Sequence, residues 1–236
     1  MKKILAFLLV VVGISLVAGA IDNEKDSKFK PIAPDMDTIK HNIENPYSNY
    51  YYKKLWRKFL SNDTNMSMQE YRHLYLGYMF QEDYDPYRRS EFSEKIQPLY
   101  YKKSHTPAEC DTIIKYAELS LADDPFDLRQ MEFFIYALKE KKKYARASIW
   151  QFRLNHLIQA ILSTGKGTKE MPWVVTSPIH EYVIINNMGM MAVEHQPLEG
   201  DVDYIIVDKP KDKKAPEGYY FDVSMLLKIR HQKFGD

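Results

Sequence analysis

The stretch "DDPFDLRQMEFFIYALKEKKKYARASIWQFRLNHLIQAIL", from Asp123 to Leu162, carries the clearest folding pattern in this chain. Large apolar residues follow one another in its second half at i, i+4, i+7 and i+11: Trp150, Leu154, Leu157 and Ile161. Because an α-helix has about 3.6 residues per turn, this spacing places the four side chains on one face. The pattern therefore predicts a helix that buries this face against neighbouring helices.

The same stretch resembles a tetratricopeptide repeat, a unit of two antiparallel helices. Asp124-Pro125 opens the unit. The packing positions of that repeat are taken by Met131, Phe134, Ala137, Leu138, Tyr144 and Ala147. Two departures are a large Ile135 where the repeat has a small residue, and lysines at 141–143 in place of a glycine turn. With a degenerate unit before it, the resemblance implies roughly one and a half to two and a half stacked units over residues 106–162.

Four further helices are predicted before Asp123. Two have apolar residues every three or four positions, at Met36, Ile39, Ile43, Tyr51, Leu55 and Phe59. The third and fourth begin with capping boxes, Ser67 with Glu70 and Thr106 with Glu109. In the third helix a stripe follows, made of Tyr71, Leu74, Tyr75 and Tyr78. We expect these tyrosines in the core, and Gly77 beside them predicts a close helix contact.

The chain changes character after Met171, where β-branched and aromatic residues become frequent. Strands are predicted at residues 173–176, 190–195, 202–207 and 219–224, with a short helix before Gly189 and a terminal helix. These strands suggest a small antiparallel sheet packed against the helices. The predicted fold class is therefore α+β, with antiparallel helix pairs in the N-terminal and central parts.

The N-terminus has the features of a signal peptide. Lys2 and Lys3 precede an apolar run of about 14 residues, Ile4 to Val17, and Ala18-Gly19-Ala20 provides small residues for cleavage. We therefore expect a signal peptide at 1–20 and a flexible leader at 21–34. A single α+β domain then spans 35–236, helical over 35–165 and mixed with β over 171–236. The expected location is periplasmic or secreted, with no membrane span after signal removal.

Charge and cysteine content narrow the function classes. The whole chain has 33 Lys and Arg against 32 Asp and Glu; without Lys2 and Lys3 the count is 31 against 32, a net charge of −1. Such a balance argues against a nucleic-acid partner. Cys110 is the one cysteine, so no internal disulfide can form, and its apolar surroundings favour a buried thiol over a nucleophile.

The C-terminal part has one cluster of polar residues with catalytic potential. His180, Glu181 and His195 are the candidate catalytic residues, and Asp201 and Asp203 lie close along the chain. Two imidazoles and two carboxylates could bind a metal, and a His–Glu pair could act in acid–base catalysis. A second histidine four residues after His180, as in zincins, is missing, and so are the other ligands of a calcium loop. No metal and no cofactor is therefore expected, and the alternative is that His180 is structural.

A turn after the third helix is the candidate binding site. Tyr84 and Tyr87 flank Asp85-Pro86, and Arg88 and Arg89 follow. Rings and cations on a loop suit a peptide or a sugar, and Tyr50, Tyr100 and Tyr101 are further rings outside the predicted core stripes. The alternative is that these tyrosines only shield junctions between loops and helices.

Several motifs together resemble a family of exported bacterial proteins, the domain of unknown function 4919. They are "EYRHLYLGYMFQEDYDPY", "DPFDLR", "QAILSTGKGT", "HEY", "GDVDY" and "GYYFDVS", over about residues 30–230. The resemblance implies a conserved exported domain and supplies no catalytic residues. We therefore expect a non-catalytic binding or assembly module that uses a helical-repeat groove, with a protein, peptide or glycan partner in the cell envelope. The alternative is a hydrolase or metal-dependent enzyme centred on His180, Glu181 and His195.

Overall fold

A computed structural model describes residues 30–208 and 215–235 of the chain. The described residues form two compact units, which are treated separately below. The helical unit comprises residues 89–151, and the sheet unit comprises the described parts of 28–88 and 152–236. The predicted signal peptide lies outside the described residues. Of the predicted leader, residues 30–34 are described, and they form neither helix nor strand.

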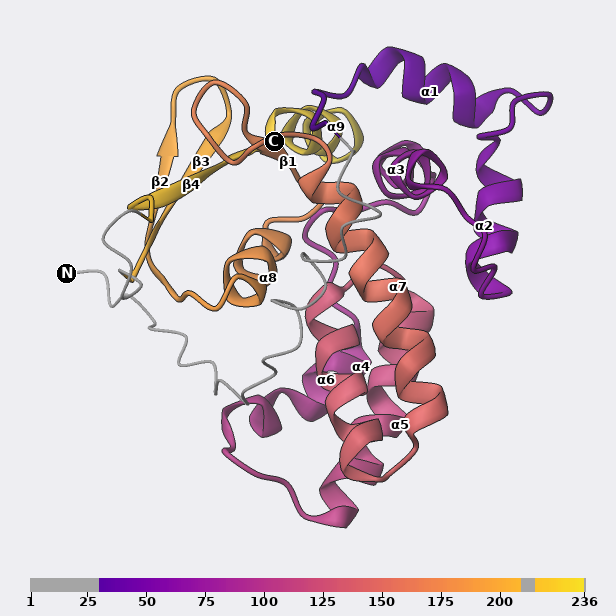
Figure 1. Cartoon of the computed structure of the whole chain (residues 1–236), viewed down its shortest axis with the longest axis vertical. Helices are drawn as coiled ribbons and strands as arrows, with labels where there is room; N and C mark the ends of the chain where they lie inside the picture. Colours follow the sequence, from indigo (N-terminus) through magenta and orange to yellow (C-terminus); the bar gives the residue numbers. More distant parts are fainter. Residues whose placement is uncertain (1–29, 209–214, 236) are drawn as a thin grey trace. The chain divides into compact units, whose positions relative to one another are not determined.

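The helical unit is built from antiparallel helices. Its elements are α4 (Glu91–Ile96), the 3-10 helix η2 (Gln97–Tyr101), α5 (Pro107–Asp123), α6 (Leu128–Glu140) and the first part of α7 (Tyr144–Leu162). Figure 1 shows α5 and α6 side by side. Because only a tight turn joins them, the two helices run in opposite directions. The predicted capping box is present, since Thr106 accepts from the Glu109 amide and Glu109 accepts from the Thr106 amide.

The core of the helical unit tests the packing positions expected from the repeat resemblance. Five of the six are completely or almost completely buried: Met131, Phe134, Ala137, Leu138 and Ala147. The expectation for Tyr144 is wrong, because this residue is 61% exposed. It is the first residue of α7, directly after the turn that follows α6. Trp150 is half-buried and meets Phe134 edge-on, with 5.2 Å between ring centroids.

In the sheet unit, α3 (Met68–Gly77) packs against both α1 (Met36–Glu44) and α2 (Tyr52–Leu60). The 3-10 helix η1 (Tyr78–Phe80) extends α3. A Cβ atom added to Gly77 would lie 2.9 Å from Cγ2 of Ile43, which confirms the close helix contact predicted at this glycine. The tyrosine stripe of α3 is in the core as predicted, with Tyr71, Tyr75 and Tyr78 exposed by 2%, 0% and 6%.

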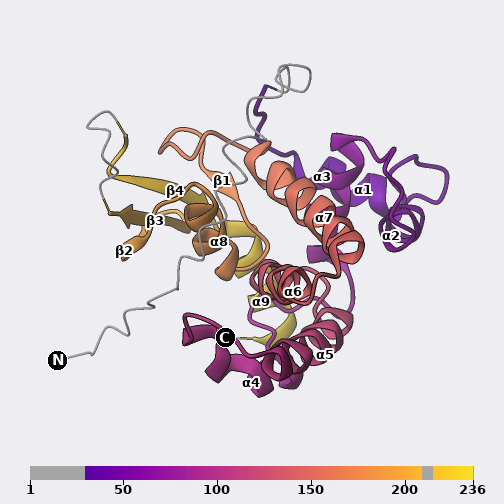
Figure 2. The same cartoon turned by 60° about the horizontal axis from the view of Figure 1, so that its bottom comes forward.

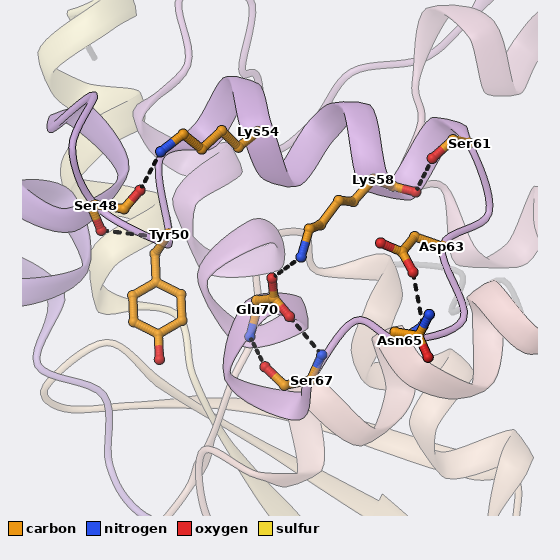
Figure 3. Close-up of polar contacts among 9 residues, drawn as sticks. All are labelled: Ser48, Tyr50, Lys54, Lys58, Ser61, Asp63, Asn65, Ser67 and Glu70. Atoms are coloured by element: carbon orange, nitrogen blue, oxygen red, sulfur yellow. Dashed lines mark hydrogen bonds and ion pairs between the residues drawn. The ribbon is translucent and has the colours of Figure 1, made fainter.

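The turn between α2 and α3 is held by charged hydrogen bonds, drawn in Figure 3. Ser67 and Glu70 form the predicted capping box, in which the Glu70 carboxylate accepts from the Ser67 amide at 2.7 Å. Lys58, on α2, reaches the other oxygen of Glu70 at 2.5 Å. One carboxylate therefore caps α3 and also joins α2 to it.

The sheet has four strands among the described residues: β1 (Trp173–Val174), β2 (Ala192–Leu198), β3 (Val202–Val207) and β4 (Gly218–Asp222). Their spatial order is β1-β4-β3-β2. The antiparallel arrangement predicted from the sequence holds for β2 with β3 and for β3 with β4. The short β1 pairs with β4 in parallel, which makes the sheet mixed.

Two helices complete the C-terminal part, α8 (Ile179–Asn187) and α9 (Ser224–Phe234), and both were predicted. The described residues thus form an α+β fold, as expected, and contain nine α-helices and one small sheet. None of these helices is both long enough and apolar enough to span a bilayer.

A buried arginine connects distant parts of the sheet unit. Arg72, on α3, is 5% exposed. Its Nη1 donates to the carbonyl and hydroxyl oxygens of Ser163, just after α7, and its Nη2 donates to the carbonyl of Ile32. Together with the hydrogen bond from the Ile32 amide to the Ser163 carbonyl at 3.0 Å, the guanidinium fixes the start of the described chain against the end of α7.

Candidate functional site

Three residues with ligand or catalytic chemistry meet where α8 faces the sheet. Glu181 lies in the first turn of α8, His195 on β2 and Asp203 on β3. His195 is opposite Ile205 in the antiparallel register, and Asp203 precedes Ile205 by two residues. Opposite residues and residues two apart share a face, so His195 and Asp203 point to the same side of the sheet. Figures 1 and 2 both show α8 beside this part of the sheet.

The three side chains form a compact group, which we call the carboxylate–histidine cluster. Nε2 of His195 lies 3.0 Å from Oδ1 of Asp203. One ligand atom from each residue, Glu181 included, lies within 4.8 Å of the other two. The Asp203 side chain is 12% exposed, whereas that of His195 is 41% exposed. The cluster is therefore buried on its helix side and open to solvent at the edge strand β2.

Glu181 has an unusual electrostatic environment. It is completely buried, and neither carboxyl oxygen accepts a hydrogen bond from an N–H or O–H group of the described residues. Burial, followed by the charge of Asp203, raises the pKa of Glu181 to about 9.

His180 has a structural position, separate from this cluster. It is 1% exposed, and its Nδ1 lies 2.7 Å from the Tyr75 hydroxyl. That hydroxyl also accepts a hydrogen bond from the Thr176 amide at 3.0 Å. Neighbouring residues on a helix point in directions about 100° apart, so His180 and Glu181 cannot both face the sheet.

The structure thus groups Glu181 with His195, and Asp203 takes the position that the sequence hypothesis gave to His180. The burial pattern of β3 alternates, and Asp203 shares the buried face with Ile205 and Val207. A carboxylate on a buried strand face is the sequence signal that distinguishes Asp203 from Asp201. Asp201 is exposed and lies in the turn before β3, with a φ of 56°.

The four candidate binding residues in the loop at 84–89 differ in how accessible their side chains are. Tyr84 is 1% exposed, and its hydroxyl donates to the Thr176 carbonyl at 2.8 Å, so its ring belongs to the core. Tyr87 is 49% exposed, with the Arg230 guanidinium 4.9 Å from its ring centroid. Arg88 donates to the Asp83 carbonyl at 2.7 Å, and Arg89 is exposed. Of the two loop tyrosines, Tyr84 and Tyr87, the second is the one with an accessible ring.

The C-terminal helix holds this loop in place. The Lys233 ammonium, on α9, donates to the carbonyls of Gln81, Glu82 and Tyr84 at 2.6, 3.0 and 3.1 Å. Partial burial lowers the pKa of Lys233. Because the ammonium uses all three donors on one loop, α9 stabilises the loop conformation that buries Tyr84.

A second aromatic surface lies in the helical unit, and we call it the α6 ring cluster. It comprises Tyr100, His105, Arg129, Phe133 and Tyr136, all half-buried. The last three stand at i, i+4 and i+7 along α6 and so share one face. Tyr100 meets Phe133 edge-on at 4.7 Å, and the rings of Phe133 and Tyr136 are nearly parallel at 6.1 Å.

Hydrogen bonds hold the α6 ring cluster in one arrangement. His105 bonds through Nδ1 to the Tyr136 hydroxyl at 2.9 Å and through Nε2 to the Leu99 carbonyl at 2.8 Å. Arg129 lies over the Tyr100 ring at 5.2 Å, and its buried Nε donates to no acceptor among the described residues. The sequence reasoning named only Tyr100 from this group. The i, i+4, i+7 spacing of Arg129, Phe133 and Tyr136 was the signal for the others.

These features describe an α+β protein with two candidate sites, one made of ionisable groups and one of rings. The chain belongs to the family described as a domain of unknown function, DUF4919, which matches residues 37–232. No curated protein and no solved structure matches the chain significantly.

Proposed function

We propose that this chain is an exported, non-catalytic binding module that captures a peptide segment of a cell-envelope partner on the α6 ring cluster. The observation that carries the proposal is the group of half-buried rings around Arg129, whose Nε has no hydrogen-bond acceptor. Rings with two rotatable bonds offer contact area at low entropic cost, and a guanidinium can donate to a peptide carbonyl or carboxylate. Because the hydrogen bonds of His105 already order the rings, little side-chain conformational entropy is lost when a ligand binds.

The proposal takes the helical unit as tetratricopeptide-like. Burial of Met131, Phe134, Ala137, Leu138 and Ala147 supports this likeness, and exposure of Tyr144 counts against it. Helical repeats use the surface of their stacked helices to bind extended partners. The periplasmic or secreted location is part of the same proposal and is supported by the signal-peptide pattern of residues 1–20.

Affinity capture from the native cell envelope tests the proposal when wild type is compared with matched variants. Phe133→Ala and Arg129→Gln should each reduce partner capture at least tenfold, because both remove contact groups of the cluster. Tyr144→Ala is the control, since it removes an exposed ring of the same unit outside the cluster. Circular dichroism checks that all variants are folded. Equal capture by all four proteins would contradict the proposal.

A second candidate function is a hydrolase or metal-dependent enzyme at the carboxylate–histidine cluster. The observation that favours it is the 3.0 Å contact between His195 and Asp203 beside the buried carboxyl of Glu181. An accessible imidazole paired with a carboxylate can move a proton, and the open side at β2 leaves room for a substrate. His195→Ala should then abolish a hydrolytic activity while the fold stays intact.

A further inference from the structure

The carboxylate–histidine cluster has one feature that the fold does not explain. A glutamate that is 0% exposed has two oxygens without any donor, although buried carboxylates elsewhere in proteins are paired or hydrogen-bonded. Its neighbours in the cluster are a second carboxylate, Asp203, and the imidazole of His195. Neither of these two residues is a permanent cation that could compensate the Glu181 carboxylate.

We propose that Glu181, His195 and Asp203 bind one divalent cation of the zinc class, with a coordination position left open to solvent. The proposal is independent of peptide binding on the α6 ring cluster, which lies in the other unit. It rests on the geometry of the three side chains, the unpaired Glu181 oxygens and the charge balance of the donor set.

The geometry is close to that of a metal centre. Ligand atoms lie about 2.0–2.2 Å from zinc, so two of them are at most about 4.4 Å apart. The His195 and Asp203 atoms are already 3.0 Å apart, and all three ligand atoms lie within 4.8 Å of one another. The side chain of His195 is 41% exposed on an edge strand, so it can make the small movement that closes the set.

The charge balance also suits a divalent ion. Two carboxylates and a neutral imidazole carry two negative charges together, so a bound M²⁺ makes the buried group neutral. Such a group avoids the cost of a net charge at a buried site.

The ligand types favour one class of ion. Calcium and magnesium prefer sets made entirely of oxygen, whereas an imidazole nitrogen with carboxylate oxygens suits zinc and neighbouring transition metals. Three protein ligands with a solvent-exposed side are typical of zinc sites that keep a water molecule in the fourth position. The exposed edge at His195 provides that side.

Isothermal titration of the metal-stripped protein with zinc chloride tests the proposal. Wild type should bind one zinc ion per chain, and its melting temperature should rise with zinc. His195→Ala and Asp203→Asn should each weaken zinc binding at least tenfold. Because His195 is exposed, its variant stays folded even where Asp203→Asn does not, and circular dichroism verifies this.

Asp201→Asn is the matched control. Asp201 lies two residues before Asp203, is exposed, and keeps a left-handed backbone that asparagine tolerates. This variant should bind zinc like wild type. The proposal is overturned if wild type binds no stoichiometric zinc, if Asp201→Asn weakens binding as much as Asp203→Asn, or if calcium binds more tightly than zinc.

Discussion

The α3 region, residues 68–88, and the α6 ring cluster are both rich in tyrosine, yet they use it differently. Tyr75 and Tyr84 in the α3 region are 0% and 1% exposed, and their hydroxyls bond with buried groups. Tyr100 and Tyr136 in the α6 ring cluster are half-buried. The comparison teaches that tyrosine density along a chain does not indicate a binding surface. The accessibility of the rings distinguishes the two regions.

The largest expected effect concerns the histidine that partners the α3 region. His180→Ala should lower the free energy of unfolding by about 2–4 kcal/mol, since it removes a buried hydrogen-bond partner of the Tyr75 hydroxyl and opens a cavity. His195→Ala should change it by less than about 0.5 kcal/mol, because its side chain is largely accessible. Urea unfolding at neutral pH in the absence of metal measures both. Similar losses for the two variants would refute separate roles for these histidines.

A pair of conservative substitutions compares the two tyrosine regions directly. Tyr75→Phe should destabilise the protein by about 1–3 kcal/mol, because the Thr176 amide and the His180 ring nitrogen lose a buried partner. Tyr136→Phe should cost less than about 1 kcal/mol, since water can replace the lost bond at the half-buried His105. Thermal and urea unfolding give the two values. If Tyr136→Phe costs as much as Tyr75→Phe, the α6 ring cluster is part of a core.

The smallest expected effect comes from the two capping boxes, at the starts of α3 and α5. The hydrogen bond from Lys102, followed by that from the Thr106 amide, lowers the pKa of Glu109 from its ordinary 4.5 to about 2. A depressed pKa in the folded state contributes stability above pH 4.5 that is lost as the pH falls towards 2. The melting temperature of wild type should therefore exceed that of Glu109→Gln near pH 6, and the gap should close towards pH 2.

Glu70→Gln provides the matching measurement in the α3 region. Glu70 is held by Lys58 and Ser67, which lower its pKa even though partial burial opposes them. The difference in melting temperature between wild type and Glu70→Gln should also shrink as the pH falls, as it does for Glu109→Gln. Added salt should reduce the Glu109 effect more, because Glu109 is the more exposed of the two. If the difference in melting temperature between wild type and a variant widens on acidification, the capping role of that carboxylate is contradicted.

Much of the fold follows from local patterns. The two capping boxes predicted the starts of α3 and α5, because the hydroxyl and carboxylate act within one turn of the helix. The stripe of Tyr71, Tyr75 and Tyr78 predicted burial, because helical spacing brings these side chains to one face. Strand β3 was predicted with its exact bounds from its run of β-branched residues.

Other features depended on neighbours that no local pattern contains. The parallel pairing of β1 with β4 joins segments far apart along the chain. Tyr84 reads as a loop residue, yet it is buried because Thr176 and α9 meet it in space. Tyr144 reads as a packing residue, yet it is exposed at the first residue of α7.

The chain's periodicity and turn chemistry were sufficient to predict an α+β protein with paired helices, its capped helix starts and most of its core tyrosines, since these depend on interactions within a few residues. The grouping of Glu181 with His195 and Asp203, and of Tyr100 and His105 with Phe133 on α6, depended on packing. Side chains from separate elements acquire a shared site only when the backbone brings them together, and that approach is governed by burial across the whole unit.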